Sequence, residues 1–308
     1  MKCSGIREYD GAVELMELPD PVISEPGQVL IDVHASGVSN WDNIVRSGSW
    51  DVGIRPPMAL GVQAAGVVRG VGAAVSRFAI GDEVLTHSVP LLHQGTWAPL
   101  FVASEAHIAH KPTAMSSLQA GLFPVPALTA HQVLESVDMQ GSETILVNGA
   151  GGITGGLLVA VAAGAGGRVI AVANPKSAER LRSYGVFAVI DYHHPDWQRQ
   201  VTHLAKGRVP VAVNAVPGAA ASLLPLLSDN GRLATITGDP PAAERGIRVS
   251  SVYVRPDGKS LEHLAADFDR RSLSLPVSAV YGLSDASEAL SAAASGRAGG
   301  GVVIDPRR

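Results

Sequence analysis

Short apolar runs and helical patterns alternate along residues 144–254. The apolar runs predict strands at residues 144–147, 168–173, 186–190, 209–216, 232–237 and 249–254, with a turn at 229–231. Helices are predicted from Ile153, from Pro175 (capped by Asn174 and closed by Gly185), and over residues 196–205 and 219–227. Runs this apolar are typical of strands buried on both faces, so this region is predicted to form a doubly wound parallel sheet.

The first third of the chain has a different pattern, with irregular β-type runs separated by Gly and Pro. Strands are predicted at residues 28–34, 64–71 and 98–102, and another follows a turn at 81–84. This spacing predicts a partly open β-barrel. Helices are predicted over residues 128–134, 261–268 and 284–294, the last capped by Ser284, and a strand over 301–304 returns to the first domain. We expect one domain at residues 1–118 and 259–308, and the doubly wound domain at 119–258.

A dense glycine turn joins the strand at residues 144–147 to the helix that begins at Ile153. Its pattern is Ala150-x-Gly152-x-x-Gly155, with alanine in the first glycine position. Small residues let the backbone approach a pyrophosphate, and the helix N-terminus offers it free N–H groups. The alternative is an ordinary tight turn, but a strand before it and a helix after it favour a Rossmann-type cofactor site. The residues expected there are Asn148, Ala150, Gly151, Gly152, Ile153, Thr154 and Gly155.

Composition excludes several classes of protein. Of the 308 residues, 46% are hydrophobic and 17% are charged, which is typical of a globular protein with a large core. The net charge of −4, without a basic stripe, argues against nucleic acid as a partner. Cys3 is the only cysteine, which excludes an intramolecular disulfide. Because we find neither a long apolar run nor a signal-peptide pattern, we expect a cytoplasmic protein with no membrane partner.

Blocks of sequence along nearly the whole chain match one family in order. They are Gly37-Val-Ser-Asn-Trp-Asp42 with Arg46-Ser-Gly48, Gly61-Val-Gln-Ala-Ala-Gly-Val-Val68, Val75-Ser-Arg-Phe-Ala-Ile-Gly-Asp-Glu-Val84, Ala127-Leu-Thr-Ala130, the glycine turn, Val189-Ile-Asp-Tyr192 and Gly296-Arg-Ala-Gly-Gly-Gly-Val-Val303. The chain therefore resembles the zinc-free quinone oxidoreductase branch of the medium-chain dehydrogenase/reductase superfamily. This resemblance implies a GroES-like catalytic domain split around a Rossmann-type nucleotide-binding domain, and it favours a homodimer.

The residues that would hold a catalytic zinc are missing. Such a site needs three well-placed Cys, His or Glu ligands. Zinc-containing relatives carry Gly-His-Glu in the block where this chain has Val62 and Gln63 after the glycine. The pairs His107 with His110 and His193 with His194 have no third ligand nearby in the sequence. We therefore expect no metal.

The end of the second strand of the nucleotide-binding domain indicates which cofactor binds. An NAD site usually has Asp or Glu there, to hold the ribose hydroxyls. This chain has Asn174, Lys176 and Ser177 instead, followed by Arg180. The cations Lys176 and Arg180 could face a 2′-phosphate, with a hydrogen bond from Ser177. Lys176 and Arg180 could also be an ordinary exposed helix face. By the resemblance, Tyr192 corresponds to a tyrosine that lies beside the same phosphate. The cofactor expected is NADPH.

Residues on the substrate side follow mainly from the resemblance. Asp42 and Thr129 match family residues of the first-domain loop and of the nicotinamide region, and Tyr253 follows the last strand of the sheet. Ser39 stands where the family commonly has asparagine, and Gln63 replaces its usual acid. We expect Ser39, Asp42, Gln63 and Thr129 to line the catalytic site, and Thr129 and Tyr253 to contact the cofactor. Alternatively, Asp42 is a loop cap and Thr129 bonds its own helix backbone. Gly301 replaces a family lysine, which removes one cationic contact.

Together these features predict an NADPH-dependent, zinc-independent reductase of a quinone or an α,β-unsaturated carbonyl. No nucleophile elbow, phosphate-loop lysine or Tyr-x-x-x-Lys pair points to another chemistry. A second hypothesis is a non-catalytic NADPH-binding sensor or structural protein with the same fold. A third, a zinc alcohol dehydrogenase, is disfavoured by the missing ligands.

Overall fold

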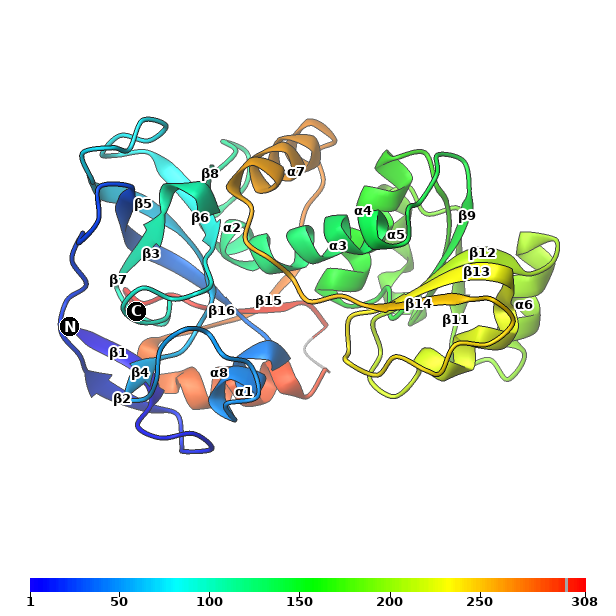
Figure 1. Ribbon diagram of the computed structural model, residues 1–308, viewed down its shortest axis with the longest axis horizontal. Helices are drawn as coiled ribbons and strands as arrows, with labels where there is room; N and C mark the ends of the chain where they lie inside the picture. Colours follow the sequence, from blue (N-terminus) through cyan, green and yellow to red (C-terminus); the bar gives the residue numbers. More distant parts are fainter. Residues whose placement is uncertain (297–298) are drawn as a thin grey trace. The chain divides into compact units, whose positions relative to one another are not determined.

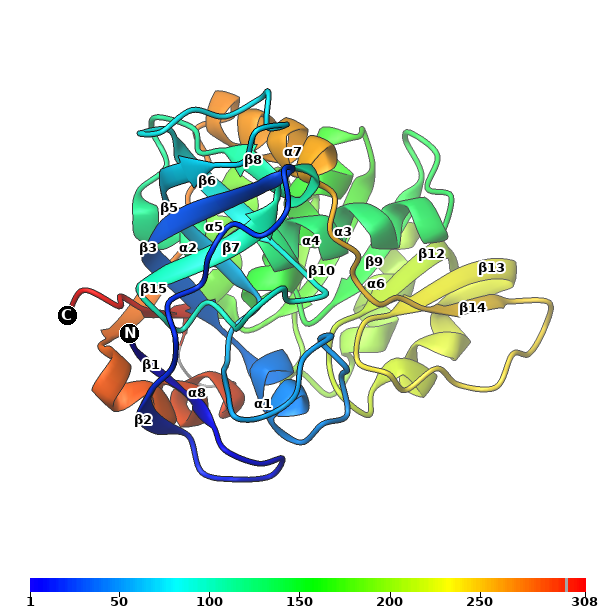
Figure 2. The ribbon, with the colours of Figure 1, turned by 60° about the vertical axis from the view of Figure 1, so that its left-hand side comes forward.

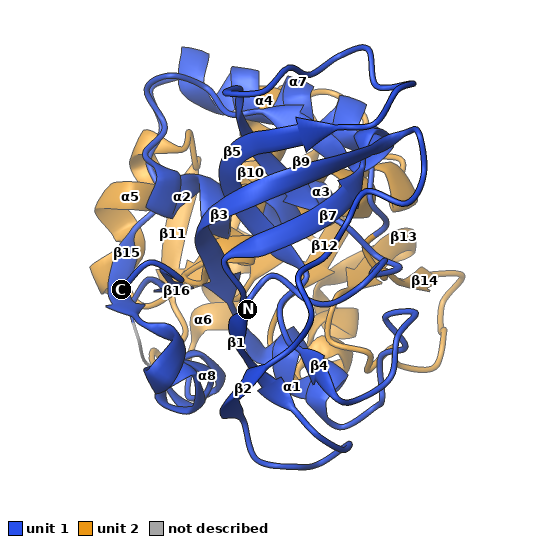
Figure 3. Cartoon of the chain, turned by 90° about the vertical axis from the view of Figure 1, so that its left-hand side faces the viewer, with its two compact units in different colours: residues 1–128, 255–308 blue, residues 129–254 orange. Residues whose placement is uncertain are grey.

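The computed structural model describes residues 1–296 and 299–308, so residues 297–298 of the last family block lie outside the described residues. The chain forms two compact units, residues 1–128 with 255–308 and residues 129–254 (Figure 3). Helix α3 (Pro124–Ser136) contains the first boundary between them. No helix within the described ranges is long and apolar enough to cross a membrane.

The second unit is built on a six-stranded parallel sheet (Figure 1). Its strands are β9 (Thr144–Asn148), β10 (Arg168–Ala173), β11 (Ala188–Asp191), β12 (Val209–Asn214), β13 (Leu227–Thr235) and β14 (Arg248–Ser251). The strand order is β11-β10-β9-β12-β13-β14. The chain adds β10 and β11 on one side of β9 and then β12 to β14 on its other side, which is the doubly wound arrangement. The Rossmann-type sheet predicted from the apolar runs is therefore confirmed.

The connections of this sheet are α4 (Ile153–Gly164), the 3₁₀ turn η2 (Pro175–Ser177) leading into α5 (Ala178–Ser183), α6 (Trp197–Ala205) and η3 (Ala220–Leu226). Two details differ from the sequence prediction. The segment predicted as a helix over residues 219–227 is a 3₁₀ helix, and Pro225 inside it cannot donate an α-helical hydrogen bond. The predicted turn at residues 229–231 is an irregularity within β13, where Asn230 has a φ of +59°.

The first unit contains two sheets. The larger has the order β15-β16-β3-β5-β6-β8, with β7 also paired to β3, and the smaller has the order β2-β1-β4. The strands are β1 (Lys2–Ile6), β2 (Glu14–Glu17), β3 (Gln28–Val38), β4 (Met58–Ala59), β5 (Gln63–Val71), β6 (Glu83–His87), β7 (Leu100–Ser104), β8 (Ile108–His110), β15 (Val277–Tyr281) and β16 (Gly301–Ile304). As predicted, the strand at residues 301–304 joins this unit, where it pairs antiparallel with β3.

The helical elements of the first unit are α1 (Asn40–Arg46), η1 (Glu105–His107), α2 (Ser117–Leu122), α7 (Gly258–Arg270), η4 (Leu283–Asp285) and α8 (Ala286–Ala294). Ser284 does not cap the last of these as predicted. It lies inside η4, and the N-cap of α8 is Asp285. The apolar pattern located the helix, but the preceding 3₁₀ turn moved its start by two residues.

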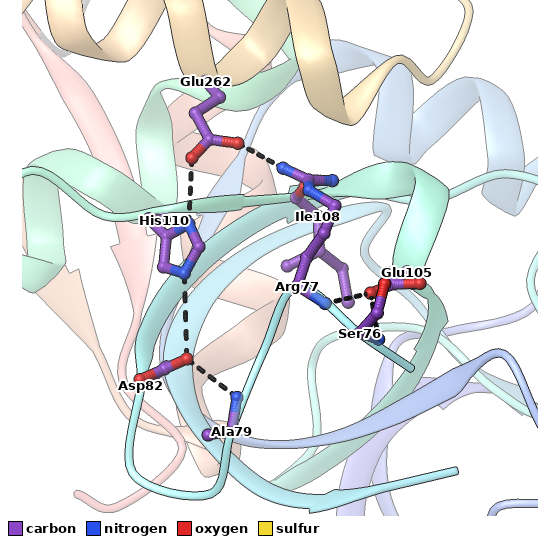
Figure 4. A network of polar contacts seen from close by, with 8 residues as sticks. All are labelled: Ser76, Arg77, Ala79, Asp82, Glu105, Ile108, His110 and Glu262. Carbon is purple, nitrogen blue, oxygen red and sulfur yellow. Dashed lines mark hydrogen bonds and ion pairs between the residues drawn. The ribbon is translucent and has the colours of Figure 1, made fainter. Parts of the chain in front are cut away.

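Helix α7 lies alongside β8, and its Glu262 joins it to residues near the larger sheet of the first unit (Figures 1, 2 and 4). The Glu262 carboxylate accepts hydrogen bonds from Arg77 and from Nδ1 of His110, the latter over 2.9 Å. Nε2 of His110 lies 3.7 Å from Asp82, which also accepts the N–H of Ala79. This network joins residues 77–82 and β8 to α7, which follows them by about 150 residues in the sequence, and so attaches the C-terminal part of the first unit to its N-terminal part.

In the second unit, α4 packs very closely on β9 at the glycine turn. A Cβ atom on Gly155 would lie 2.1 Å from the Gly149 carbonyl oxygen, whereas one on Gly152 would have no neighbour closer than 3.8 Å. Gly155→Ala should therefore lower the free energy of unfolding by about 1–3 kcal/mol, the usual range for overpacking. Gly152→Ala is the matched control, and its cost should stay below about 1 kcal/mol. Urea unfolding of both variants tests this, and equal losses would contradict the close approach.

Candidate functional site

The glycine turn places a helix N-terminus at the carboxyl end of the parallel sheet. Gly149 has a φ of +82°, and the N–H groups of Gly149 and Ala150 both donate to the Val172 carbonyl of the neighbouring strand. Gly152 is the N-cap of α4 without a side-chain cap, so the first-turn N–H groups of Ile153, Thr154 and Gly155 precede the helical hydrogen bonds. The residues predicted to bind the cofactor phosphates thus lie together in one turn that is suited to an anion.

The end of β10 carries no acidic side chain. Asn174 is the N-cap of η2, and its side-chain oxygen accepts the N–H of Lys176 over 2.9 Å. Lys176 is exposed, and the Ser177 hydroxyl lies 3.2 Å from where a Cβ atom on Gly151 would stand. Tyr192 follows the end of β11, which pairs with β10. The structure therefore brings Lys176, Ser177 and Tyr192 to adjacent strand ends.

The Tyr192 ring is half exposed and lies against a histidine. Its centroid is 4.0 Å from that of His193, and Nδ1 of His193 lies 2.7 Å from the Asp191 carboxylate. Backbone and side-chain hydrogen bonds from His193 outweigh desolvation and hold the pKa of Asp191 below its usual range. This carboxylate is therefore ionised at neutral pH, and its hydrogen bonds to His193 hold the imidazole next to the Tyr192 ring.

Arg180 lies differently from the expectation that it faces a 2′-phosphate. Its Nη2 donates to the Gly151 carbonyl over 2.6 Å, and its Nη1 is buried without a hydrogen-bond partner. A Cβ atom on Gly156 would lie 2.4 Å from that Nη1. The guanidinium therefore packs against the glycine turn instead of standing on an open helix face.

A polar network that sequence reasoning largely missed crosses the point where the strand order reverses. Asn148 ends β9 and donates to Asn214, which ends β12 and is fully buried. The Asn214 amide also contacts the hydroxyls of Thr235 and Thr237, and both hydroxyls donate to Asp239. Only Asn148 was predicted. The available signal was that Asn148, Asn214 and Thr235 each place a polar side chain at the end of an apolar strand.

Asp239 fixes the two loops that follow β12 and β13. Burial alone would raise the pKa of its carboxyl, but hydrogen bonds from Thr237, Thr235 and the N–H of Gly218 outweigh burial and hold the pKa below its usual range. Tyr253 is 74% exposed, and its hydroxyl lies 3.7 Å from where a Cβ atom on Gly238 would stand. The exposed ring predicted to contact the cofactor therefore lies beside the loop that carries Asp239.

In the first unit, Gln63 has structural partners. It is 1% exposed, and its side-chain oxygen accepts the N–H of Val125 in the first turn of α3 over 2.8 Å. Its backbone carbonyl accepts the hydroxyls of Ser36 and Thr96. These bonds fasten the beginning of α3 to β5, and a substrate contact for Gln63 stays a prediction.

Ser39 and Asp42 form the start of α1. Asp42 is fully buried, and its Oδ2 accepts the N–H of Ser39, the N-cap residue, over 2.9 Å. Its Oδ1 is buried without a partner. Burial raises the pKa of this carboxyl to about 8, against the effect of the backbone hydrogen bonds. The geometry supports the helix-cap alternative for Asp42. Thr129, in α3, is 7% exposed, and its contact with nicotinamide stays a prediction.

Within residues 1–296 and 299–308, no three His, Cys, Asp or Glu side chains are grouped so that they could hold a metal ion. The histidines considered above have other partners. His107 contacts the Ser88 hydroxyl, and His110 lies between Asp82 and Glu262. His193 contacts Asp191, and Nδ1 of His194 accepts the N–H of Asp196.

Comparison with known proteins finds two family matches along the chain. Residues 25–113 match the alcohol dehydrogenase GroES-like domain, and residues 184–304 match the zinc-binding dehydrogenase domain. The chain is 32% identical to the quinone oxidoreductase of Pseudomonas aeruginosa, over 67% of this chain and 64% of that protein. It is also 32% identical to the erythronolide synthase EryA2 of Saccharopolyspora erythraea, over 68% of this chain and 6% of that protein. The chain thus matches less than two thirds of the length of either relative.

A solved structure has the same fold over the full length. The crystal structure of an NAD-dependent alcohol dehydrogenase superposes with a TM-score of 0.87 at 26% identity, covering 99% of both chains. Two matched domains, relatives at about a third identity and a fold shared from end to end agree on one assignment. The chain belongs to the medium-chain dehydrogenase/reductase superfamily.

Proposed function

We propose that this protein is an NADPH-dependent, zinc-independent oxidoreductase that transfers hydride to a quinone or an α,β-unsaturated carbonyl. The observation that carries the cofactor assignment is the end of β10. The side-chain oxygen of Asn174 accepts the N–H of Lys176, and neither Asn174 nor Lys176 offers a carboxylate to the ribose hydroxyls. The Asp191 carboxylate at the end of the neighbouring strand is engaged by His193. Lys176 is left exposed at the same place.

The remaining parts of a dinucleotide site support this proposal. The first turn of α4 offers N–H groups and a positive dipole end to the pyrophosphate. Lys176, Ser177 and Tyr192 stand at adjacent strand ends and could surround a 2′-phosphate. Bound NADPH would supply the hydride, and the residues of this chain would bind and orient it.

The choice of substrate follows from what the polar residues of the first unit do. The side-chain oxygen of Gln63 accepts the N–H of Val125. Val62 stands where zinc-containing relatives have a zinc ligand. Asp42 is buried and caps a helix. Of these groups only the amide N–H₂ of Gln63 is left as a donor. A neutral amide polarises an isolated carbonyl weakly, so we infer that the acceptor stabilises the arriving charge itself. Quinones and enones do so by delocalising charge onto oxygen, and the Pseudomonas relative is a quinone oxidoreductase.

The protein would then act mainly by alignment and exclusion of water, with hydrogen bonds to the developing enolate or quinol oxygen. Ser39 and Thr129 are the candidates for these hydrogen bonds. A cytoplasmic location and a homodimer are part of the proposal. β14 is the end strand of its sheet, so its free edge could serve as the dimer contact.

The first test concerns the 2′-phosphate. Lys176→Ala should weaken NADPH binding by roughly 1–3 kcal/mol, the range for a hydrogen bond to a charged group, and leave NADH nearly unchanged. Calorimetric titration with both cofactors measures this. Arg199→Ala, which removes a cation exposed on α6, is the control. An equal loss for NADPH and NADH would contradict the assigned role of Lys176.

The second test concerns the acceptor. Oxidation of NADPH should be fast with an enone and slow with the matching saturated ketone, because only the enone spreads the incoming charge. Absorbance at the cofactor band follows both reactions. Faster turnover of the saturated ketone would refute the proposed chemistry.

The third test concerns Asp42. Its pKa is raised from 3.8 to about 8 in the folded protein, so the folded state binds this proton more tightly than the unfolded state. The contribution of Asp42 to the free energy of unfolding should therefore be fully present below about pH 4 and fall as pH rises to about 8, by roughly 1.4 kcal/mol per pH unit at most. Asp42→Asn keeps an acceptor for the Ser39 N–H and removes the titration.

The variant should therefore melt close to the parent at about pH 4 and above it at pH 8, as circular dichroism can measure. Because both proteins share all other titrating groups, only the difference between them matters. A difference in melting temperature that is the same at both pH values would show that Asp42 does not titrate in this way.

A further inference from the structure

Arg180 carries a charge whose surroundings lack a counter-ion. Its guanidinium donates from Nη2 to the Gly151 carbonyl and lies 5.5 Å from the centroid of the Tyr184 ring. Its Nη1 is buried and unbonded. Among the ion pairs of residues 1–296 and 299–308, none includes Arg180. A partly buried cation without an anion is costly, so an anion bound nearby would be favoured.

A glycine at the start of α4, Gly156, leaves space for the Arg180 side chain. Gly155 is needed because the Gly149 carbonyl leaves no room for a Cβ atom, but that does not explain the glycine that follows. A Cβ atom on Gly156 would lie 2.4 Å from Nη1 of Arg180. The two consecutive glycines therefore meet separate requirements, and Gly156 makes room for the guanidinium under the first turn of α4.

The hydrogen bond from Arg180 also fixes the orientation of a peptide that otherwise has only one long hydrogen bond, from the N–H of Gly152 to the Gly149 carbonyl over 3.3 Å. The peptide between Gly151 and Gly152 is flanked by residues without Cβ atoms, so both of its orientations are sterically accessible. A carbonyl oxygen turned toward a bound phosphate would repel it. With Nη2 holding the Gly151 oxygen over 2.6 Å, the carbonyl stays on the side of α5.

We propose that Arg180 is a positioning residue of the phosphate-binding turn. It holds the Gly151 carbonyl in the orientation that accepts an anion and supplies positive charge to the pyrophosphate. This rests on the proposed function, because it takes the ligand to be a nicotinamide dinucleotide. Since NADPH and NADH share the pyrophosphate, Arg180 should support both cofactors equally, whereas Lys176 should support NADPH alone.

The test is calorimetric titration of the full chain with NADPH and with NADH. Arg180→Met, which keeps the length of the side chain, should weaken both cofactors by a similar factor of about ten or more. Arg180→Lys keeps the charge and a donor and should recover part of this loss. Arg182→Met, the loss of an exposed cation on the same helix, is the matched control and should change neither affinity.

Turnover separates positioning from a merely structural role. In Arg180→Met the KM for NADPH should rise by a similar factor, while kcat at saturating NADPH should change less than twofold. A protein that only folds less well would lose active fraction and therefore kcat, with an unchanged KM. That result would overturn the proposal, and so would Arg180→Met that binds both cofactors like the parent.

Gly156→Ala provides a second route that does not remove the charge. Its Cβ atom should displace the guanidinium and weaken both cofactors, and the double variant Gly156→Ala with Arg180→Ala should lose less than the sum of the two single changes. Strict additivity would contradict the packing argument.

Two other outcomes separate this inference from the function on which it rests. Loss of NADPH affinity alone in Arg180→Met would assign Arg180 to the 2′-phosphate and overturn the positioning role. A parent protein that binds neither dinucleotide would refute the proposed function, and the inference with it.

Discussion

The structure of the second unit depends on the close packing of α4 against β9. The Gly149 carbonyl, in the turn that follows β9, lies where a side chain on Gly155 would begin, so α4 can pack against this turn only through glycine. This contact sets the first turn of α4 at the carboxyl end of the parallel sheet, beside the ends of β10 and β12. The cofactor site proposed here is therefore a consequence of backbone packing, and the side chains around it refine its charge.

The sequence predicted the elements of the second unit well, because strands buried on both faces are continuously apolar and the glycine turn has a local pattern. It could not predict which polar residues meet. Asn214, Thr235 and Asp239 come together only because β12 and β13 are neighbours in the folded sheet. Arg180 was expected to face a 2′-phosphate or to lie on an exposed helix face, because its partner is a backbone carbonyl that no sequence pattern marks.

The first unit shows a different limit of sequence reasoning. Asp42 and Gln63 are polar residues at family positions, and the sequence suggested chemistry for both. In the folded chain Gln63 holds the beginning of α3, and Asp42 caps α1 with a carboxyl whose pKa burial raises to about 8. Each side chain accepts a backbone N–H through one oxygen, as buried polar groups usually do. Because Gln63 and Asp42 have these structural roles, we propose a hydride acceptor that is easily reduced without strong polarisation by the protein.

The most direct test of the proposed hydride transfer follows a deuterium label from NADPH into the product. NADPH deuterated at C4, in the position that is transferred, would be incubated with the protein and an enone in ordinary water, and the product analysed by nuclear magnetic resonance. Hydride transfer to the enone predicts deuterium at the β-carbon of a saturated ketone, with a solvent proton at the α-carbon. Deuterium at the carbonyl carbon of an allylic alcohol, or a product without deuterium, would contradict it.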